Sequence, residues 1–286
     1  NLTKATGDRY GISGGLAPLK AVVPTFSTKT IQQSTPVSGA SNLITVTLTA
    51  NYDLTTGGSG GTVTITGLAG SGTATSASLA VTTCASNSLG TTGSWNKDSG
   101  TLILTVGTTV AANTACEITF TLTNPTSDLT SPDVSVEAAL TDGSSSIGSI
   151  ASAAMVKATG DRYGISGGLA PLKVVVPTFS TKTIQQSTPV SGASNNEMTV
   201  TITSNYVLNT GSGAAAAKVT ITGLAGSGTA TSASLAVTTC ASDSLGTTGS
   251  WNDDGTLILT VGTTVAANTA CEITFTLTNP TSDLTS

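Results

Sequence analysis

The residues of this chain that could do chemistry are two serines, each in a glycine-rich stretch. Residues 11–15 read Gly-Ile-Ser-Gly-Gly, and the same five residues recur at 164–168. This matches the G-x-S-x-G pattern of a nucleophile elbow, in which the serine attacks a carbonyl while a histidine takes its proton. The chain has 286 residues and no histidine. We therefore interpret both stretches as glycine-rich turns.

A lysine can act as the base in place of histidine, and Lys20 and Lys173 lie near the two serines in sequence. Such a lysine must be desolvated to lose its proton near neutral pH, and nothing around these lysines predicts burial. The stretch 67–72 is also rich in glycine, but it lacks the Gly-Lys-Ser/Thr ending of a phosphate-binding loop. We predict that the chain is not an enzyme and binds no cofactor.

The acidic residues are candidates for calcium ligands between modules. They are scattered along the chain, whereas a calcium loop places its oxygen ligands within about a dozen residues. We expect solvated loop carboxylates, with Asp8 and Arg9 as a local ion pair, and no metal site. The candidates are Asp8, Asp53, Asp128, Asp133, Glu137 and Asp142.

Four cysteines remain as reactive groups. They are Cys84 with Cys116, and Cys240 with Cys271. An even number that recurs predicts disulfides, each closing a loop of about 30 residues and stabilising the fold by roughly 3–4 kcal/mol. Free buried thiols and a metal site are the alternatives, and the metal site lacks histidine ligands. Disulfides imply an oxidising compartment, so we expect an extracellular or cell-surface protein.

Charge and composition restrict the partners. Charged residues are 9% of the chain, the net charge is −5, and the ten basic residues do not cluster. A nucleic-acid partner is excluded because neutralising phosphates needs a basic surface, and no apolar window reaches the roughly 18 residues of a membrane span. Ser and Thr form about a third of the residues, which predicts covalent glycans, with Asn1, Thr35 and Thr188 among the sites.

Internal repetition organises the chain. Residues 4–20 recur unchanged at 157–173, residues 63–86 at 219–242, and residues 101–131 at 256–286. We infer two domains, 1–153 and 154–286, of which the second lacks the counterpart of 132–153. Because the chain begins without an initiator Met or an apolar signal region, we expect a processed product or part of a longer chain.

Alternating apolar and threonine residues predict short half-buried strands. With turn residues between them, about nine such strands in each repeat favour an all-β fold of two tandem Ig-like Greek-key β-sandwich modules. The tryptophan of each GTTGSWN stretch is expected in a turn, capping an open end of the sandwich. The predicted strands of the first repeat are 20–26, 28–33, 43–50, 62–66, 78–83, 101–106, 116–123, 133–140 and 147–151.

The repeat also resembles those of large secreted or surface proteins of unicellular algae and flagellate protists. The resemblance spans nearly the whole chain and implies an array of Ig-like sandwiches in a cell wall, surface coat or filament. It transfers no catalytic residues. It is carried by the stretches VVPTFSTKTIQQSTP, VTITGLAGSGTATSASLAV, GTLILTVGTTVAANTACEITFTLTNP and PDVSVEA.

These observations predict a structural subunit of an extracellular filament or cell-surface fibre, with modules joined head to tail. The alternative is an adhesin or carbohydrate-binding surface module. The missing counterpart of residues 132–140 leaves two possibilities for the second module. Either the chain continues, or residues 1–26 of a neighbouring subunit insert as a donated strand and build a homopolymer.

Overall fold

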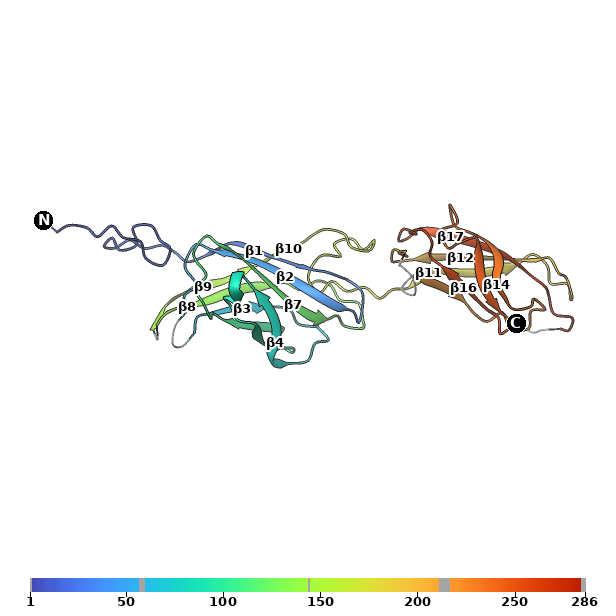
Figure 1. The fold of residues 1–286 in the computed structure, drawn as a ribbon, viewed down its shortest axis with the longest axis horizontal. Helices are drawn as coiled ribbons and strands as arrows, with labels where there is room; N and C mark the ends of the chain where they lie inside the picture. Colours follow the sequence, from blue (N-terminus) through green and yellow to red (C-terminus); the bar gives the residue numbers. More distant parts are fainter. Residues whose placement is uncertain (1, 57–59, 144, 211–216, 284–286) are drawn as a thin grey trace. The chain divides into compact units, whose positions relative to one another are not determined.

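The computed structural model describes residues 2–56, 60–143, 145–210 and 217–283. Over these residues the chain is built of β-strands and divides into two compact units (Figure 1). This confirms the prediction of an all-β protein with two β domains. Unit 1 consists of Asn1–Arg162 and Ser166–Val176, and unit 2 of Tyr163–Ile165 and Pro177–Ser286.

Unit 1 is a single curled sheet with the strand order β10-β1-β2-β7-β4-β5-β6-β3-β8-β9. β4 pairs with β5 through its first half and with β7 through its last residues, so it joins the two halves of the sheet. The strands are β1 (Phe26–Gln33), β2 (Ser41–Ala50), β3 (Thr62–Thr66), β4 (Ser76–Thr83), β5 (Thr92–Asn96), β6 (Thr101–Thr105), β7 (Ala115–Thr123), β8 (Ser135–Asp142), β9 (Ser145–Ala154) and β10 (Val156–Lys157).

Unit 2 repeats the first seven of these strands. Its sheet order is β11-β12-β17-β14-β15-β16-β13, which matches the order from β1 to β3 in unit 1 strand for strand. Among the described residues of unit 2, β13 is a sheet edge, whereas its counterpart β3 pairs with β8. The strands are β11 (Phe179–Gln186), β12 (Asn196–Ser204), β13 (Lys218–Ile221), β14 (Ser232–Thr239), β15 (Thr248–Asn252), β16 (Thr256–Thr260) and β17 (Ala270–Leu277).

The core of unit 1 follows from the period-two pattern. In β2 the buried positions Ile44, Val46 and Leu48 alternate with threonines, as the sequence predicts. The same cluster of buried residues includes Val63 of β3 and Ile118 of β7, so side chains from both halves of the sheet meet in one aliphatic core. In the described residues no helix has the length and apolar character needed to cross a bilayer.

Two sequence predictions about local structure are wrong. Residues 20–25 form no strand, because β1 begins only at Phe26. Trp95 does not lie in a turn: it is part of β5 and is 1% exposed within the core, with Nε1 donating to the carbonyl oxygen of Thr73 at 3.2 Å. Trp251 of β15 is buried in the same way. Glycine and serine around each tryptophan suggested a turn, but burial of the indole fixes a strand.

Candidate interaction surface

The glycine-rich stretches are closed turns rather than nucleophile elbows. The ammonium of Lys20 donates to the backbone carbonyl oxygen of Ser13, and Lys173 makes the equivalent bond to Ser166 at 2.5 Å. In both copies the lysine thus binds the serine's carbonyl oxygen and stabilises the turn.

The local ion pair predicted between Asp8 and Arg9 is wrong. The carboxylate of Asp8 accepts a hydrogen bond from the amide of Gly14 at 2.7 Å, which closes the same turn. Arg9 instead pairs with Asp142 at 3.0 Å. Proximity in sequence suggested Arg9 as the partner, but the backbone amide of Gly14 binds the Asp8 carboxylate instead.

A tyrosine pair stands beside this ion pair. The rings of Tyr10 and Tyr52 stack with their centres 5.3 Å apart, and the Tyr10 hydroxyl donates to Asp142 at 2.5 Å. Burial raises the pKa of the Tyr52 phenol, with a further contribution from Tyr10, while Arg9 acts in the opposite direction. The hydrogen bond to Tyr10 is the main cause that raises the pKa of Arg9. These contacts attach the residues around Tyr10 to the rest of unit 1.

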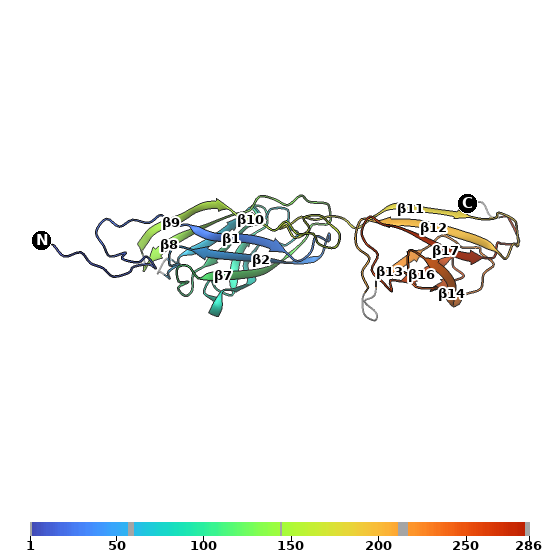
Figure 2. The same ribbon diagram turned by 90° about the horizontal axis from the view of Figure 1, so that it is seen from above.

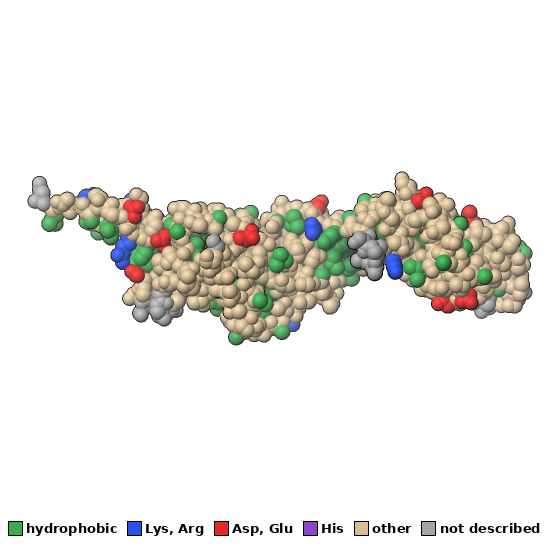
Figure 3. Space-filling view, viewed as in Figure 1, with side chains coloured by type: hydrophobic (Ala, Val, Ile, Leu, Met, Phe, Trp, Pro, Cys, Tyr) green, Lys and Arg blue, Asp and Glu red, His purple; other side chains and the backbone are tan. Residues whose placement is uncertain are grey.

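The other acidic candidates remain apart. Asp53 accepts a hydrogen bond from the amide of Ala112 at 2.8 Å, and Asp133 pairs with Lys157 at 3.0 Å. Over the described ranges, no group of three potential ligands could hold a metal ion. Figure 3 shows charged side chains scattered over a mostly uncharged surface.

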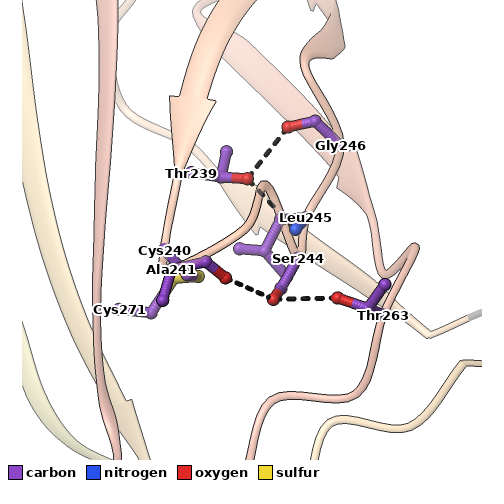
Figure 4. The surroundings of a disulfide bond; sticks show 8 residues. All are labelled: Thr239, Cys240, Ala241, Ser244, Leu245, Gly246, Thr263 and Cys271. Atoms are coloured by element: carbon purple, nitrogen blue, oxygen red, sulfur yellow. Dashed lines mark hydrogen bonds between the residues drawn. A yellow bond between two sulfur atoms is a disulfide. The ribbon is translucent and has the colours of Figure 1, made fainter.

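The structure joins Cys84 to Cys116 and Cys240 to Cys271, the pairs that the sequence predicts, with Cα atoms 4.5 Å apart in each. Disulfides of this kind indicate a secreted or surface protein. Figure 4 shows that the turn after Cys240 is fixed by side-chain hydrogen bonds. Thr239 Oγ1 donates to the carbonyl oxygen of Gly246 at 2.9 Å, and Ser244 Oγ donates to that of Ala241 at 3.0 Å.

Two of the predicted glycosylation sites lie in connections between strands. Thr35 and Thr188 are half-buried, and each hydroxyl oxygen accepts a hydrogen bond from the amide two residues later, at 3.2 and 3.3 Å. Asn1 lies outside the described residues. Modification of these residues stays a prediction.

The most extensive feature outside the core is a segment from the start of the second repeat that packs on the first unit. We call residues 154–162 and 166–176 the docking segment, and residues 26–37 the acceptor edge. β10 of the docking segment runs parallel to β1, with Thr30 opposite Val156, and the two strands lie side by side in Figure 2. Leu172 of the segment is 0% exposed and Val174 is 1% exposed. Leu172 belongs to the core cluster of unit 1, so the segment is anchored in that core.

Three buried amide side chains prepare the acceptor edge. Asn42 Nδ2 donates to Gln33 Oε1 and to Asn124 Oδ1, both at 2.8 Å. Gln33 Nε2 then donates to the carbonyl oxygens of Gly168 and Lys173, at 2.9 and 2.8 Å. These three residues, which we call the amide triad, are each no more than 2% exposed. Buried amides stabilise a fold only when they are satisfied, so the triad and the docking segment depend on each other.

Backbone hydrogen bonds extend the contact along the edge. The Ala158 amide donates to the carbonyl oxygen of Ile31 at 3.0 Å, and the Gln33 amide donates to that of Leu169 at 3.0 Å. Further on, Val175 donates to the carbonyl oxygen of Pro36 at 2.9 Å. The edge of β1 is thus covered by paired backbone groups.

Unit 2 carries the same acceptor sequence, since residues 177–194 repeat residues 24–41 exactly. Its side chains, however, are exposed among the described residues. Ile184 is 49% exposed where Ile31 is 1% exposed, and Val190 is 62% exposed. Gln186 is exposed although its counterpart is buried. The edge strand β11 pairs with β12 alone in the described part of the sheet.

Comparison with solved structures shows a likeness at the level of the fold. The fold is similar to the crystal structure at 3.65 Å of the serine-rich repeat protein Srr2 from Streptococcus agalactiae, with a TM-score of 0.26 and 12% sequence identity over 89% of this chain and 85% of that one. At this TM-score we draw no functional conclusion from the likeness. No protein-family model and no curated protein matches the chain. The resemblance to algal and protist repeats stays an expectation from the sequence.

Sequence reasoning missed the amide triad. Its signal was nevertheless present: Gln33 and Asn42 occupy strand positions in phase with the buried Ile31 and Ile44. A polar residue at a core-facing position needs a buried partner. The same amides recur in the second repeat as Gln186, Asn196 and Asn279, so their placement is systematic.

Proposed function

We propose that this protein is a structural, non-enzymatic subunit of an extracellular fibre or cell-surface array. The observation that carries this proposal is the docking segment. The start of the second sequence repeat is folded into the core of the first unit, where Leu172 is fully buried and Gln33 binds two of the segment's carbonyl oxygens. A segment that joins repeats through such packing suits an array better than a set of independent domains.

Other features of the described residues support this role. One disulfide in each unit joins a strand to the residue that follows another strand, which suits a secreted protein. The surface presents many threonine hydroxyls and few charges, which suits covalent glycans as the solubilising layer. The half-buried Thr35 and Thr188, together with Asn1, are the glycosylation sites that we propose.

Negative-stain imaging of the native material tests the function. We expect thin fibres or a regular surface layer, and isolated particles at all concentrations would contradict the proposal. The glycans are tested separately by intact mass before and after deglycosylation: native material should lose mass when its glycans are removed. An unchanged mass would reject glycosylation and leave the structural role standing.

An adhesive role makes a different prediction. Carbohydrate-binding surfaces commonly present aromatic rings on which sugars stack, but both tryptophans are buried, with Trp95 at 1% and Trp251 at 0% exposure. Tyr10 and Tyr52 stack on each other. A glycan array should therefore give no saturable binding, and specific binding to one glycan class would favour the adhesin.

A further inference from the structure

We propose that residues 2–9 and 13–23 of one chain dock on the exposed edge of unit 2 in a second copy of this chain. We call these two stretches the donor segment and residues 179–190 the open edge. The inference rests on the proposed function, because it names the partner that would join one subunit to the next. It also makes a claim about binding that can fail on its own.

The first argument is that donor and docking segments are the same peptide. Residues 4–20 are identical to residues 157–173, and residues 177–194 are identical to residues 24–41. Both halves of the contact in unit 1 therefore have a second copy in the chain. Identical side chains in the same order can make the same hydrogen bonds and the same buried contacts.

The second argument is that both second copies expose apolar surface. Leu19, the counterpart of the fully buried Leu172, is 103% exposed, and Val23 is 77% exposed. Of the ten large hydrophobic residues that are exposed in the described chain, seven belong to the donor segment or the open edge. Exposed apolar side chains gathered on two elements indicate binding surfaces. The seven are Leu2, Leu16, Leu19, Val22, Val23, Ile184 and Val190.

The third argument is that the donor segment already holds its docked backbone conformation around the turn. The Leu16 amide donates to the carbonyl oxygen of Gly7 at 2.9 Å, and the equivalent bond in the docking segment, from Leu169 to Gly160, is 3.0 Å. The Lys20 amide donates to the carbonyl oxygen of Ala17 at 3.2 Å, and the equivalent bond from Lys173 to Ala170 is 3.1 Å. A preformed turn loses little conformational entropy on binding.

The fourth argument is that the open edge is prepared in the same way. Asn196 Nδ2 donates to Gln186 Oε1 at 2.9 Å and to Asn279 Oδ1 at 2.6 Å, so the counterparts of the amide triad are assembled in unit 2. Within the described residues, Gln186 Nε2 meets no protein acceptor, whereas Gln33 Nε2 binds two carbonyl oxygens of the docking segment. A cavity of 680 Å³ opens beside it. Its lining includes Gln186, Asn196, Met198, Leu224, Leu277 and Asn279.

The register of unit 1 specifies the contacts of the complex. Gln186 Nε2 of one chain should donate to the carbonyl oxygens of Gly15 and Lys20 of the other, and Leu19 should enter the core of unit 2. This places the donor along β11, and not along β13 at the position of the missing counterpart of β8. Donor and acceptor are different surfaces of one chain, so the contact is heterologous, and unless it closes into a ring it builds a filament.

Complementary variants of the full chain test the proposal by sedimentation velocity over a range of concentrations. Leu19→Asp disables the donor and Ile184→Asp disables the open edge, and both residues are exposed in the monomer. We expect the unaltered chain to form a concentration-dependent series of oligomers. Each variant alone should associate roughly 100-fold or more weakly, because docking would bury an unpaired carboxylate.

The decisive sample is the mixture of the two variants. Ile184→Asp still has a donor and Leu19→Asp still has an open edge, so the mixture should form dimers and nothing longer. Matched controls are Thr6→Asp and Gln185→Asp, whose counterparts Thr159 and Gln32 stay exposed in the docked contact of unit 1. Both controls should associate as the unaltered chain does.

A mixture that stays monomeric while the unaltered chain associates would overturn the proposal, as would an unaltered chain that stays monomeric. Thermal unfolding of each variant shows that it is folded. If the mixture dimerises but the native material contains no fibres, the proposed function fails and the docking contact stands. If fibres exist and the variants have no effect, the function stands and this contact is wrong.

A gain-of-affinity variant sharpens the test. The donor has Ala21 where the docking segment has Val174, which is 1% exposed. Ala21→Val adds two methyl groups to the buried contact and should tighten association by about tenfold. The control Thr6→Val adds apolar surface at a position that stays exposed, and it should change nothing. Equal effects of the two variants would contradict docking in this register.

Discussion

One peptide occurs in this protein in two environments. In the copy at 157–173, residues 157–162 and 166–173 are part of unit 1, and Leu172 is fully buried. In the copy at 4–20, the equivalent Leu19 is completely exposed. Three backbone hydrogen bonds of the turn, made by the amides of Leu16, Ala17 and Lys20, recur in the second copy at Leu169, Ala170 and Lys173. The difference teaches that the sequence of the segment determines its turn, while burial depends on whether an acceptor edge lies within reach.

The largest contrast should come from truncating the two leucines. Leu172→Ala removes buried methyl groups and should destabilise unit 1 by about 4 kcal/mol, whereas Leu19→Ala at a fully exposed position should change stability by less than about 0.5 kcal/mol. Hydrogen exchange read by mass spectrometry in dilute solution resolves the two units. Equal effects of the two substitutions would show that the docking segment is not packed as described.

The disulfides should give similar effects in the two units. Replacing Cys84 and Cys116 by serine opens a loop with a sequence separation of 32, and replacing Cys240 and Cys271 opens one of 31. Each double variant should lose about 3.5 kcal/mol from its own unit in the chain-entropy model. Denaturant unfolding followed by hydrogen exchange measures both losses. A much larger loss in either unit would show that the two cores are less alike than their sequences.

A smaller contrast is expected at the glutamines. Gln33→Ala leaves the carbonyl oxygens of Gly168 and Lys173 without their donor, and should cost unit 1 about 2 kcal/mol. The side chain of Gln186 is exposed and accepts a hydrogen bond from Asn196. Gln186→Ala should therefore lower the stability of unit 2 by less than about 1 kcal/mol. The same hydrogen-exchange measurement compares them. The reverse order would contradict the docked structure.

The smallest effect concerns pH and unit 1 alone. The pKa of Tyr52 is raised in the folded state by burial, and that of an unfolded tyrosine is about 10. The folded state thus favours the protonated phenol, and this contribution to stability is present below pH about 10 and is lost as the pH rises through the folded pKa. Tyr52→Phe should flatten the decline in the melting temperature of unit 1 between neutral and alkaline pH. If the melting temperature of unit 1 fell equally in the unaltered chain and in Tyr52→Phe, ionisation of Tyr52 would not be the cause.

The sequence predicted most of the fold because alternation and duplication are local signals. The buried face of β2 and the range of β3 could be assigned from period-two alternation alone. β5 was missed because Thr92–Asn96 contains glycine and serine, and only packing of Trp95 into the core makes it a strand. The partner of Arg9 was missed because Asp142 is 133 residues away, a long-range contact without a local signal.

The docked contact within unit 1 was not predicted. From the repeat frame, the sequence suggested either that the chain continues or that residues 1–26 of a neighbouring subunit fill the missing counterpart of residues 132–140, and this assembly stays a proposal. It did not indicate the amide triad or the edge beside β1, because both depend on which strands become neighbours. Gln33, Asn42 and Asn124 come from separate parts of the chain and meet only in the folded sheet.

The parallel pairing of β10 with β1 has a mechanical consequence. Tension along the chain pulls β1 from its first residue and β10 from its last, and these ends point in opposite directions when neighbouring strands are parallel. The bond from Ala158 to Ile31, next to this parallel pair, is therefore loaded in shear, while the bonds that join Leu169 to Gln33 and Val175 to Pro36 lie further along the chain and are reached first by tension from the C-terminal side. Resistance to stretching is governed by the rate of forced unfolding. If the chain is stretched, we expect this edge of the sheet to be the last part of the docked contact to yield.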